Sequence, residues 1–294
     1  MLKRNLVRTG FLSQGLLMLL PNATSVKGEP VVHSASYSGR ALADSTLPLA
    51  DSVSTFASGR LARSLTAAPE VTLNRNASRF VATFLRREEE ALAKTRGRCS
   101  SYFRMMDTIF TREGLPVELK YLAVVESDLK NNAVSRMGAR GLWQLMPTTA
   151  RELGLHIGKK YDERTAVYKS TVAAAKYLKA LYANFGDWLL VMAAYNAGPG
   201  TIDQAIRRSG SRNFWVLQRY LPIESRGHVK RFIGTHYYFE GKGGLTTLTR
   251  AETTTYNARQ KKWMEASRDT AASVKKEKQS VVISYQNIQQ NIIY

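Results

Sequence analysis

The amino-acid sequence predicts a mainly α-helical domain between about residues 71 and 240 of this 294-residue chain. Three observations predict this fold class. Apolar residues recur at intervals of three and four, which is the spacing of one helix face. Gly186 and Asp187 form a helix stop followed directly by a helix cap. The alternation of strand-like and helix-like segments that a parallel sheet would require does not occur.

The first predicted helices follow one another with short connections. One carries an apolar stripe at residues 80–85, with charged residues on the side that faces the solvent. The next spans about residues 100–111. Pro116 suits the first turn of a third helix. We expect that helix to end near Asn131.

A turn or small hairpin is predicted next, at residues 135–141, because Gly138 and Gly141 allow unusual backbone angles. The helical pattern then resumes and continues to about residue 239. The further helices are expected from Pro147 onward, over residues 162–182, over residues 188–195, and from Pro222 to about Phe239.

The segments that flank residues 71–240 differ from them in composition, and we expect poorly structured tails. In residues 1–25, basic residues precede a modest apolar run and then small residues, which is the order of a signal peptide. Residues 26–70 are rich in Ser, Ala and Gly and are predicted to be a flexible linker. Residues 241–294 form a basic extension to which the pattern assigns no fold, and a helical appendage and the remnant of a longer architecture both stay open.

The charge of the chain favours acidic partners. Its 43 basic and 23 acidic residues give a formal net charge of +20. Such a balance suits nucleic acid, an anionic membrane surface or an acidic polymer. The one cysteine, Cys99, excludes an intrachain disulfide, and no lipid-anchor cysteine is visible near the N-terminus. The four histidines lack metal-ligand spacing, so we expect no metal and no cofactor.

Glu126 is the acidic residue with the most informative surroundings. It continues a helical row of leucines at positions 115, 119 and 122, so it lies on a face that should otherwise be buried. Burial disfavours an ionised carboxylate, and a carboxylic acid that stays protonated can act as a general acid. Asp128 is close in sequence, but side chains two residues apart on a helix do not face the same way. Glu126 on its own could also be a helix-end carboxylate satisfied by backbone amides.

Four motifs in this order resemble those of a known family. They are Glu126-Ser127, the segment GARGLWQLMP at 138–147, the segment AAYNAGPG at 193–200, and the segment LPIESR at 221–226. They resemble the soluble lytic transglycosylases of glycoside hydrolase family 23, which have a goose-type lysozyme-like fold. The fourth motif is similar to that of the membrane-bound murein transglycosylase D type. The resemblance covers about residues 71–240.

The resemblance implies that the chain cleaves peptidoglycan between N-acetylmuramic acid and N-acetylglucosamine. It implies that Glu126 is the single catalytic acid and later the base, and that a 1,6-anhydromuramic acid end forms without water. It also implies a set of substrate-binding residues: Ser127, Gln144, Met146, Tyr195, Asn196 and His228. A buried Tyr195 needs a partner for its hydroxyl, and Glu126 is the expected one.

His228 departs from the family pattern, because it stands where a tyrosine is usual. The charge of a histidine changes near neutral pH, so this replacement affects how the site depends on pH. Trp143 is expected to be structural rather than a platform for sugar rings. The other glycines and prolines of the motifs are expected to shape the backbone.

Several alternatives stay open at this point. A hydrolytic muramidase on the same fold would give a reducing end, and a noncatalytic cell-wall-binding protein would retain only the fold. A nucleic-acid binder is suggested by charge alone, and no nucleic-acid motif supports it. We expect export to the cell envelope, most simply the periplasm, with peptidoglycan strands as the partner. Association with the membrane or the wall and the oligomeric state are not decided by the sequence.

Overall fold

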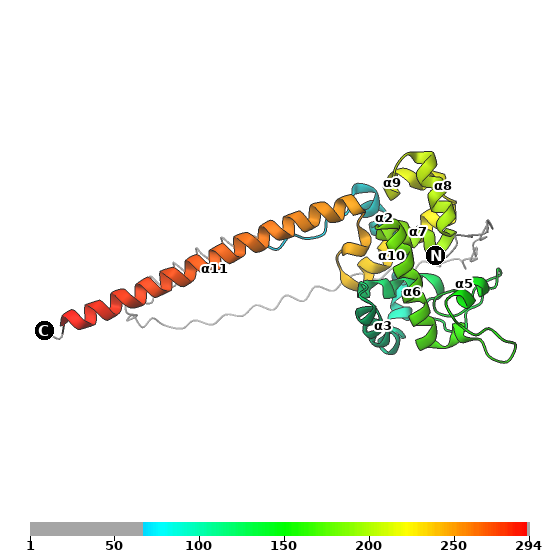
Figure 1. The fold of residues 1–294 in the computed structure, drawn as a ribbon, viewed down its shortest axis with the longest axis horizontal. Helices are drawn as coiled ribbons and strands as arrows, with labels where there is room; N and C mark the ends of the chain where they lie inside the picture. Colours follow the sequence, from blue (N-terminus) through cyan, green and yellow to red (C-terminus); the bar gives the residue numbers. More distant parts are fainter. Residues whose placement is uncertain (1–66, 293–294) are drawn as a thin grey trace, which may run out of the picture. The chain divides into compact units, whose positions relative to one another are not determined.

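The computed structural model describes residues 67–292 of the chain, which are helical with isolated β-bridges only (Figure 1). This confirms the predicted mainly α fold class. The elements are, in order, α2 (Arg75–Arg96), α3 (Cys99–Glu113), η1 (Val117–Lys120), α4 (Tyr121–Ser127), α5 (Pro147–Glu152), η2 (Glu163–Thr165), α6 (Val167–Phe185), α7 (Trp188–Ala197), α8 (Pro199–Ser209), α9 (Phe214–Leu217), η3 (Gln218–Tyr220), α10 (Ile223–Glu240), η4 (Leu245–Thr247) and α11 (Arg250–Ile292).

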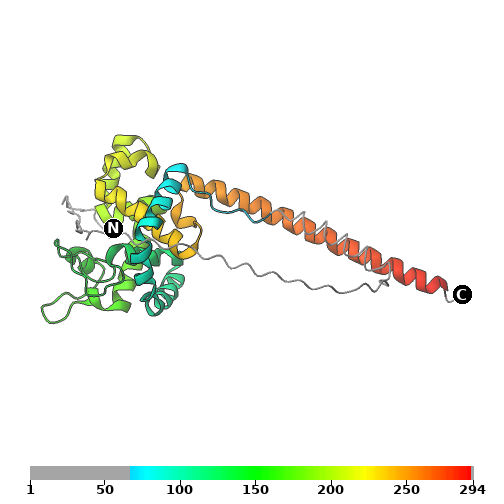
Figure 2. The ribbon, with the colours of Figure 1, turned by 180° about the vertical axis from the view of Figure 1, so that it is seen from behind.

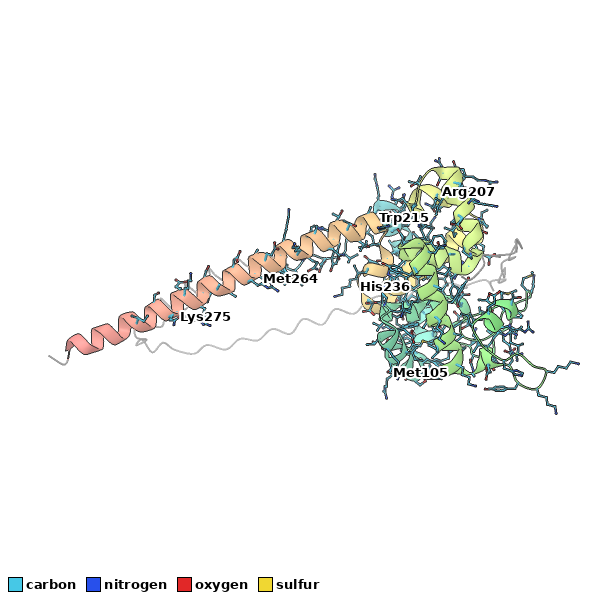
Figure 3. All side chains as sticks on the ribbon, viewed as in Figure 1. Met105, Arg207, Trp215, His236, Met264 and Lys275 are labelled. Atoms are coloured by element: carbon cyan, nitrogen blue, oxygen red, sulfur yellow. The ribbon has the colours of Figure 1, made fainter. Side chains whose placement is uncertain are left out.

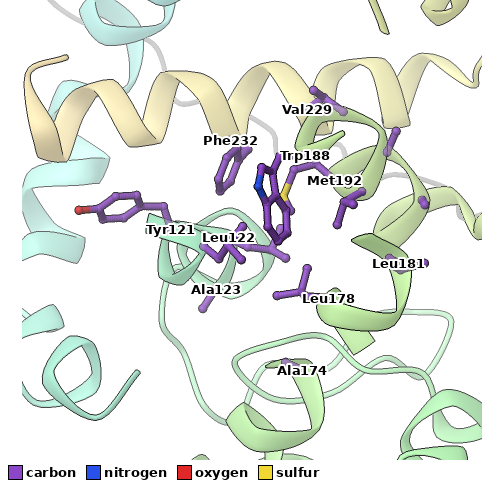
Figure 4. Close-up of a cluster of buried hydrophobic side chains, with 14 of the residues drawn as sticks. Tyr121, Leu122, Ala123, Ala174, Leu178, Leu181, Trp188, Met192, Val229 and Phe232 are labelled. Atoms are coloured by element: carbon purple, nitrogen blue, oxygen red, sulfur yellow. The ribbon is translucent and has the colours of Figure 1, made fainter. Parts of the chain in front are cut away.

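Helix α10 is central to the core, because it packs against α2, α4 and α7. Figure 4 shows Phe232 of α10 beside Trp188 and Met192 of α7 and above Leu122 of α4. Each large apolar side chain buried in this way contributes roughly 1.5–3 kcal/mol. Helices α2 and α10 approach closely at Gly234, where a Cβ atom would lie 2.3 Å from the ring of Phe84. A residue without a side chain is therefore required there.

Helix ends in this core follow the local signals of the sequence. Gly186 ends α6 with a φ of 62°, a left-handed conformation that favours glycine. The Asp187 carboxylate then accepts hydrogen bonds from the backbone amides of Leu189 (2.9 Å) and Leu190 (3.2 Å) at the start of α7. The predicted stop and cap are both observed.

The structure differs from expectation at three helices. Helix α4 ends at Ser127, not near Asn131, because Asp128 and Leu129 adopt φ values of 51° and 58°. Pro199, expected only to end a helix, also begins α8, where a proline fits the first turn. The segment over 162–182 divides into η2 and α6.

The C-terminal extension is a correction to the expected poorly structured tail, since residues 250–292 form one helix, α11. Its many charged residues gave no clear apolar periodicity from which to predict it. The proposed signal peptide at 1–25 and most of the linker at 26–70 lie outside the described residues. Within residues 67–292, no helix is both long enough and apolar enough to span a membrane.

Residues 69–260 belong to one compact unit, and residues 261–292 belong to a second. The start and the end of the first unit are held together (Figure 2). Asn74, which caps α2, donates a hydrogen bond to Glu252 in the first turn of α11 at 3.2 Å. Gln260 donates to the backbone carbonyl of Pro69 at 3.0 Å. Two segments about 190 residues apart are thus fastened side by side.

His236 of α10 is a buried histidine outside the site described below (Figure 3). It is 1% exposed, and its Nδ1 atom lies 3.3 Å from the hydroxyl of Thr246. The ring meets that of Tyr121 edge to face, with centroids 5.7 Å apart. Burial lowers the pKa of His236 from an ordinary value of 6.5 to about 4, which means that the folded protein favours the neutral ring.

We predict that His236 lowers the free energy of unfolding in mild acid. The unfolded chain binds a proton to this residue below pH about 6.5 and the folded protein only below about 4. The neutral ring therefore contributes fully to the free energy of unfolding above pH 6.5. As the pH falls toward 4, the free energy of unfolding decreases by about 3 kcal/mol in total. Urea denaturation at pH 7 and pH 4.5 should show a smaller loss of unfolding free energy in His236→Gln than in the wild type. Equal losses in the two proteins would contradict this prediction.

Candidate active site

Glu126 lies in the last turn of α4, where its side chain is 13% exposed. Its Oε1 atom is 2.9 Å from Nε2 of His228, a residue of α10 whose side chain is 2% exposed. The Nδ1 atom of His228 is buried and has no hydrogen-bond partner among the described residues. Two motifs that are 102 residues apart in sequence are therefore joined by a direct contact of their functional side chains.

Tyr195 and Asn196 enter the site from the end of α7. The Tyr195 hydroxyl donates a hydrogen bond to the backbone carbonyl of Trp143 at 2.8 Å, so the expected pairing with Glu126 is wrong. Burial raises the pKa of Tyr195 well above its usual value, and the nearby negative charge of Glu126 adds to this. Tyr195 is thus a neutral neighbour of Glu126. The side-chain oxygen of Asn196 accepts a hydrogen bond from the Ser225 hydroxyl at 2.7 Å.

Ser127 and Trp143 are both held by the protein itself. The Ser127 hydroxyl lies 3.0 Å from the carbonyl oxygen of Ala123 and 2.9 Å from that of Leu142, which ties α4 to the following loop. Trp143 is fully buried, and its indole N–H donates to the Thr171 hydroxyl at 3.0 Å. The structural role expected for Trp143 is therefore observed. Contact of Ser127 with substrate stays a prediction.

Gln144 and Met146 lie on the loop that precedes α5. Gln144 has a φ of 45°, and its side-chain nitrogen donates to the carbonyl oxygens of Ala133 (3.2 Å) and Gly141 (2.9 Å). The nitrogen is committed to the loop, so the side-chain oxygen is the atom that Gln144 offers to a ligand. Met146 is half-buried and directly precedes α5. The substrate contacts of both residues stay predictions.

A buried ion pair supports this loop, and sequence reasoning missed it. Arg164 pairs with Asp162 at 2.7 Å and donates to the carbonyl oxygens of Gly138 (2.6 Å) and Leu145 (3.0 Å). The hydrogen bonds from Arg164 hold the pKa of Asp162 below its usual value. At Gly141, with a φ of 83°, a Cβ atom would lie only 2.1 Å from the carbonyl oxygen of Arg164. The glycine lets the loop lie directly on this pair.

Glu126 is the site's single carboxylate in the described contacts. Asp128 adopts a φ of 51° and pairs with Lys130 at 3.3 Å, with its side chain 54% exposed. The described residues contain no cluster of three or more His, Cys, Asp or Glu side chains that could hold a metal ion. A mostly buried carboxyl group beside a histidine and polar amides is suited to proton transfer to and from a bound ligand.

Part of the chain is similar to known proteins. Residues 109–218 match the family model described as the transglycosylase SLT domain. The chain is 39% identical to the membrane-bound lytic murein transglycosylase D of Escherichia coli (strain K12) over 127 residues, which are 42% of this chain and 28% of that protein. The predicted resemblance to lytic transglycosylases is confirmed for this part of the chain.

Two further proteins are similar over comparable lengths. The membrane-bound lytic murein transglycosylase F of Maricaulis maris (strain MCS10) is 34% identical over 138 residues, which are 43% of this chain and 27% of that protein. The solved structure of the 70 kDa soluble lytic transglycosylase SLT70 from Escherichia coli is 25% identical, with a TM-score of 0.45, and covers 51% of this chain and 26% of that one. The chain spans less than a third of the length of these three relatives.

We predict that alanine is tolerated at Gly138 but not at Gly141. Both glycines have a φ of 83°, but a Cβ atom on Gly138 would meet nothing within 4 Å. Gly138→Ala should cost about 1–2 kcal/mol for the left-handed conformation alone. Gly141→Ala should cost roughly 1–3 kcal/mol more, because the Arg164 carbonyl must move. Urea denaturation of the two variants measures the difference, and equal losses would show that the loop does not rest on Arg164.

Proposed function

We propose that this chain is a lytic transglycosylase that cleaves the β-1,4 bond between N-acetylmuramic acid and N-acetylglucosamine in peptidoglycan. The observation that carries the proposal is Glu126, a mostly buried carboxyl group within the matched residues 109–218, which is paired with His228 at 2.9 Å. The similarity to proteins named as lytic murein transglycosylases supports the same substrate class.

Glu126 first acts as the general acid. It donates its proton to the glycosidic oxygen, the bond from that oxygen to the anomeric carbon of N-acetylmuramic acid breaks, and the leaving sugar takes up the proton. A single carboxylate requires another group to stabilise the positive charge at the anomeric carbon. The substrate's own acetamido group supplies this stabilisation, so no second acid from the protein is needed.

Glu126 then acts as the base. The C6 hydroxyl of N-acetylmuramic acid attacks the anomeric carbon while the Glu126 carboxylate takes the hydroxyl proton. The new carbon–oxygen bond closes a 1,6-anhydro ring, and Glu126 is returned to its protonated state. Water is not consumed, so the reaction is a lyase-type cleavage rather than a hydrolysis.

The neighbours of Glu126 orient the acid and the sugar. His228 fixes Oε1 of Glu126, which leaves the second carboxyl oxygen for the substrate. The Asn196 amide, held through its oxygen by Ser225, and the free oxygen of Gln144 suit the acetamido and hydroxyl groups of the sugars. We place this activity in the cell envelope, where peptidoglycan lies, in agreement with the basic charge of the chain.

We predict that Glu126→Gln folds normally and loses about 10²–10⁴-fold of the activity, as expected for removal of a general acid. The measurement is mass spectrometry of soluble products after incubation with peptidoglycan sacculi. The wild type should release products that end in 1,6-anhydro-N-acetylmuramic acid. Reducing ends would instead indicate a hydrolytic muramidase, and undiminished turnover by the variant would exclude Glu126 as the acid.

We predict that His228→Tyr keeps activity within about tenfold of the wild type, because a tyrosine hydroxyl can also hydrogen-bond to a carboxylate. Initial rates on glycan strands test this statement. Complete inactivation, with a normal thermal transition, would show that the imidazole itself is needed.

A further inference from the structure

A pocket of about 280 Å³ lies at the end of α7 opposite to Tyr195 and Asn196. It is lined by the end of α6, the first residues of α7, and the segment from η4 to the first turn of α11. Eight residues separate Trp188 from Asn196, which corresponds to about 12 Å along a helix. The pocket is therefore separate from the residues around Glu126. Its lining residues from α6 and α7 lie within the matched residues 109–218, and those from Leu245 to Thr254 lie beyond them.

One wall of the pocket is aromatic. The rings of Tyr182 and Trp188 are stacked, with centroids 4.2 Å apart and an angle of 22° between the ring planes. Trp188 is held among core side chains (Figure 4) and is 7% exposed. Tyr182 is 39% exposed. A rigid, anchored tryptophan thus presents a tyrosine ring to the solvent. Such flat amphipathic faces bind the apolar faces of other rings at low entropic cost.

The other side of the pocket carries Arg250, whose guanidinium has no ion pair or hydrogen bond among the described residues. The Arg250 guanidinium reaches over Gly186, with Nη1 3.7 Å from where a Cβ atom on that glycine would lie. Both oxygens of Asp187 accept backbone hydrogen bonds, and both oxygens of Glu252 are bound by neighbouring residues. Within the described part of the chain, the Arg250 side chain forms no ion pair or hydrogen bond. A planar guanidinium in this state is a ready partner for a carboxylate.

We propose that this pocket is a second binding site, which takes a sugar ring whose attached peptide bears a carboxylate. The ring stacks on Tyr182, and the carboxylate pairs with Arg250. The volume is near the lower end of the roughly 300–1,000 Å³ typical of small-molecule sites, so one ring fits rather than a chain of them. Because it rests on the proposed function, the inference names the ligand as peptidoglycan, whose sugars carry acidic stem peptides.

A second site of this kind would help to retain the protein on its substrate. It would hold another part of the same polymer while Glu126 acts on the bond in the catalytic site. The weak binding of a single ring in the pocket is then added to the binding at the site around Glu126. The chain is retained on the polymer more strongly than by either site alone. Loss of the pocket should reduce retention on the insoluble wall and leave the chemistry at Glu126 unchanged.

The test uses the full chain with Glu126→Gln as background, so that bound substrate is not consumed. Retention on sacculi is compared for Tyr182→Ala, Tyr182→Phe and Arg250→Gln, with Arg208→Gln as the control that removes one exposed charge elsewhere. Arg250→Gln should weaken retention about tenfold, the scale of one charge-assisted contact. Tyr182→Ala should weaken it about three- to tenfold, the scale of one aromatic stacking contact. Tyr182→Phe and Arg208→Gln should change it less than twofold. Arg250→Gln removes no described contact of its side chain and should fold normally.

Small probes distinguish the contribution of the sugar ring to binding from that of the carboxylate. A soluble disaccharide–tetrapeptide from peptidoglycan should shift the tryptophan fluorescence or the NMR signals of residues around Trp188, whereas acetate and neutral chitotetraose should each bind at least tenfold more weakly. Equal binding of acetate, or equal losses with Arg250→Gln and Arg208→Gln, would overturn the proposal. If wild-type protein releases no products from sacculi but the probe still binds through Arg250, the proposed function fails and the pocket stands.

Discussion

The buried pair of Asp162 and Arg164 is the interaction on which the geometry around Glu126 depends. A buried guanidinium is costly unless its donors are satisfied, and here Arg164 meets the carboxylate and two loop carbonyls, those of Gly138 and Leu145. The loop between these carbonyls is thereby given one conformation. That loop carries the backbone groups that hold Ser127 and Tyr195 beside Glu126. The charge pair thus fixes the loop whose carbonyl groups bind the hydroxyls of Ser127 and Tyr195.

Helix α10 and helix α7 connect this loop to the rest of the fold. The first turns of α10 supply Ser225 and His228, and its later turns supply core residues, so the packing of α10 against α4 also sets the distance from His228 to Glu126. Helix α7 ends at the site and begins at Asp187, where the carboxylate also accepts the backbone amide of Arg250. One helix therefore runs from the pocket beside Trp188 to the residues around Glu126.

Local signals were sufficient for most helices and for selecting Glu126 and His228, whose side chains the structure brings together. Caps, stops and apolar spacing act over a few residues, as at Asp187, and the motifs around Glu126 and His228 could be recognised one by one. The partner of the Tyr195 hydroxyl could not be predicted, because the choice between a carboxylate and a backbone carbonyl depends on where a distant loop lies. The role of Arg164 was missed for the same reason: its carbonyl partners are 19 and 26 residues away, and no local pattern marks them.

The hydrogen bonds from Asn74 to Glu252 and from Gln260 to Pro69 have a consequence for the history of the domain. They bring the first and last residues of the compact unit to the same place on its surface. A unit of this kind can be inserted into a host chain, or joined to different neighbours, while its own core stays intact. The chain enters and leaves such a unit on the same side. This modularity agrees with relatives in which the shared region is only 27–28% of the protein.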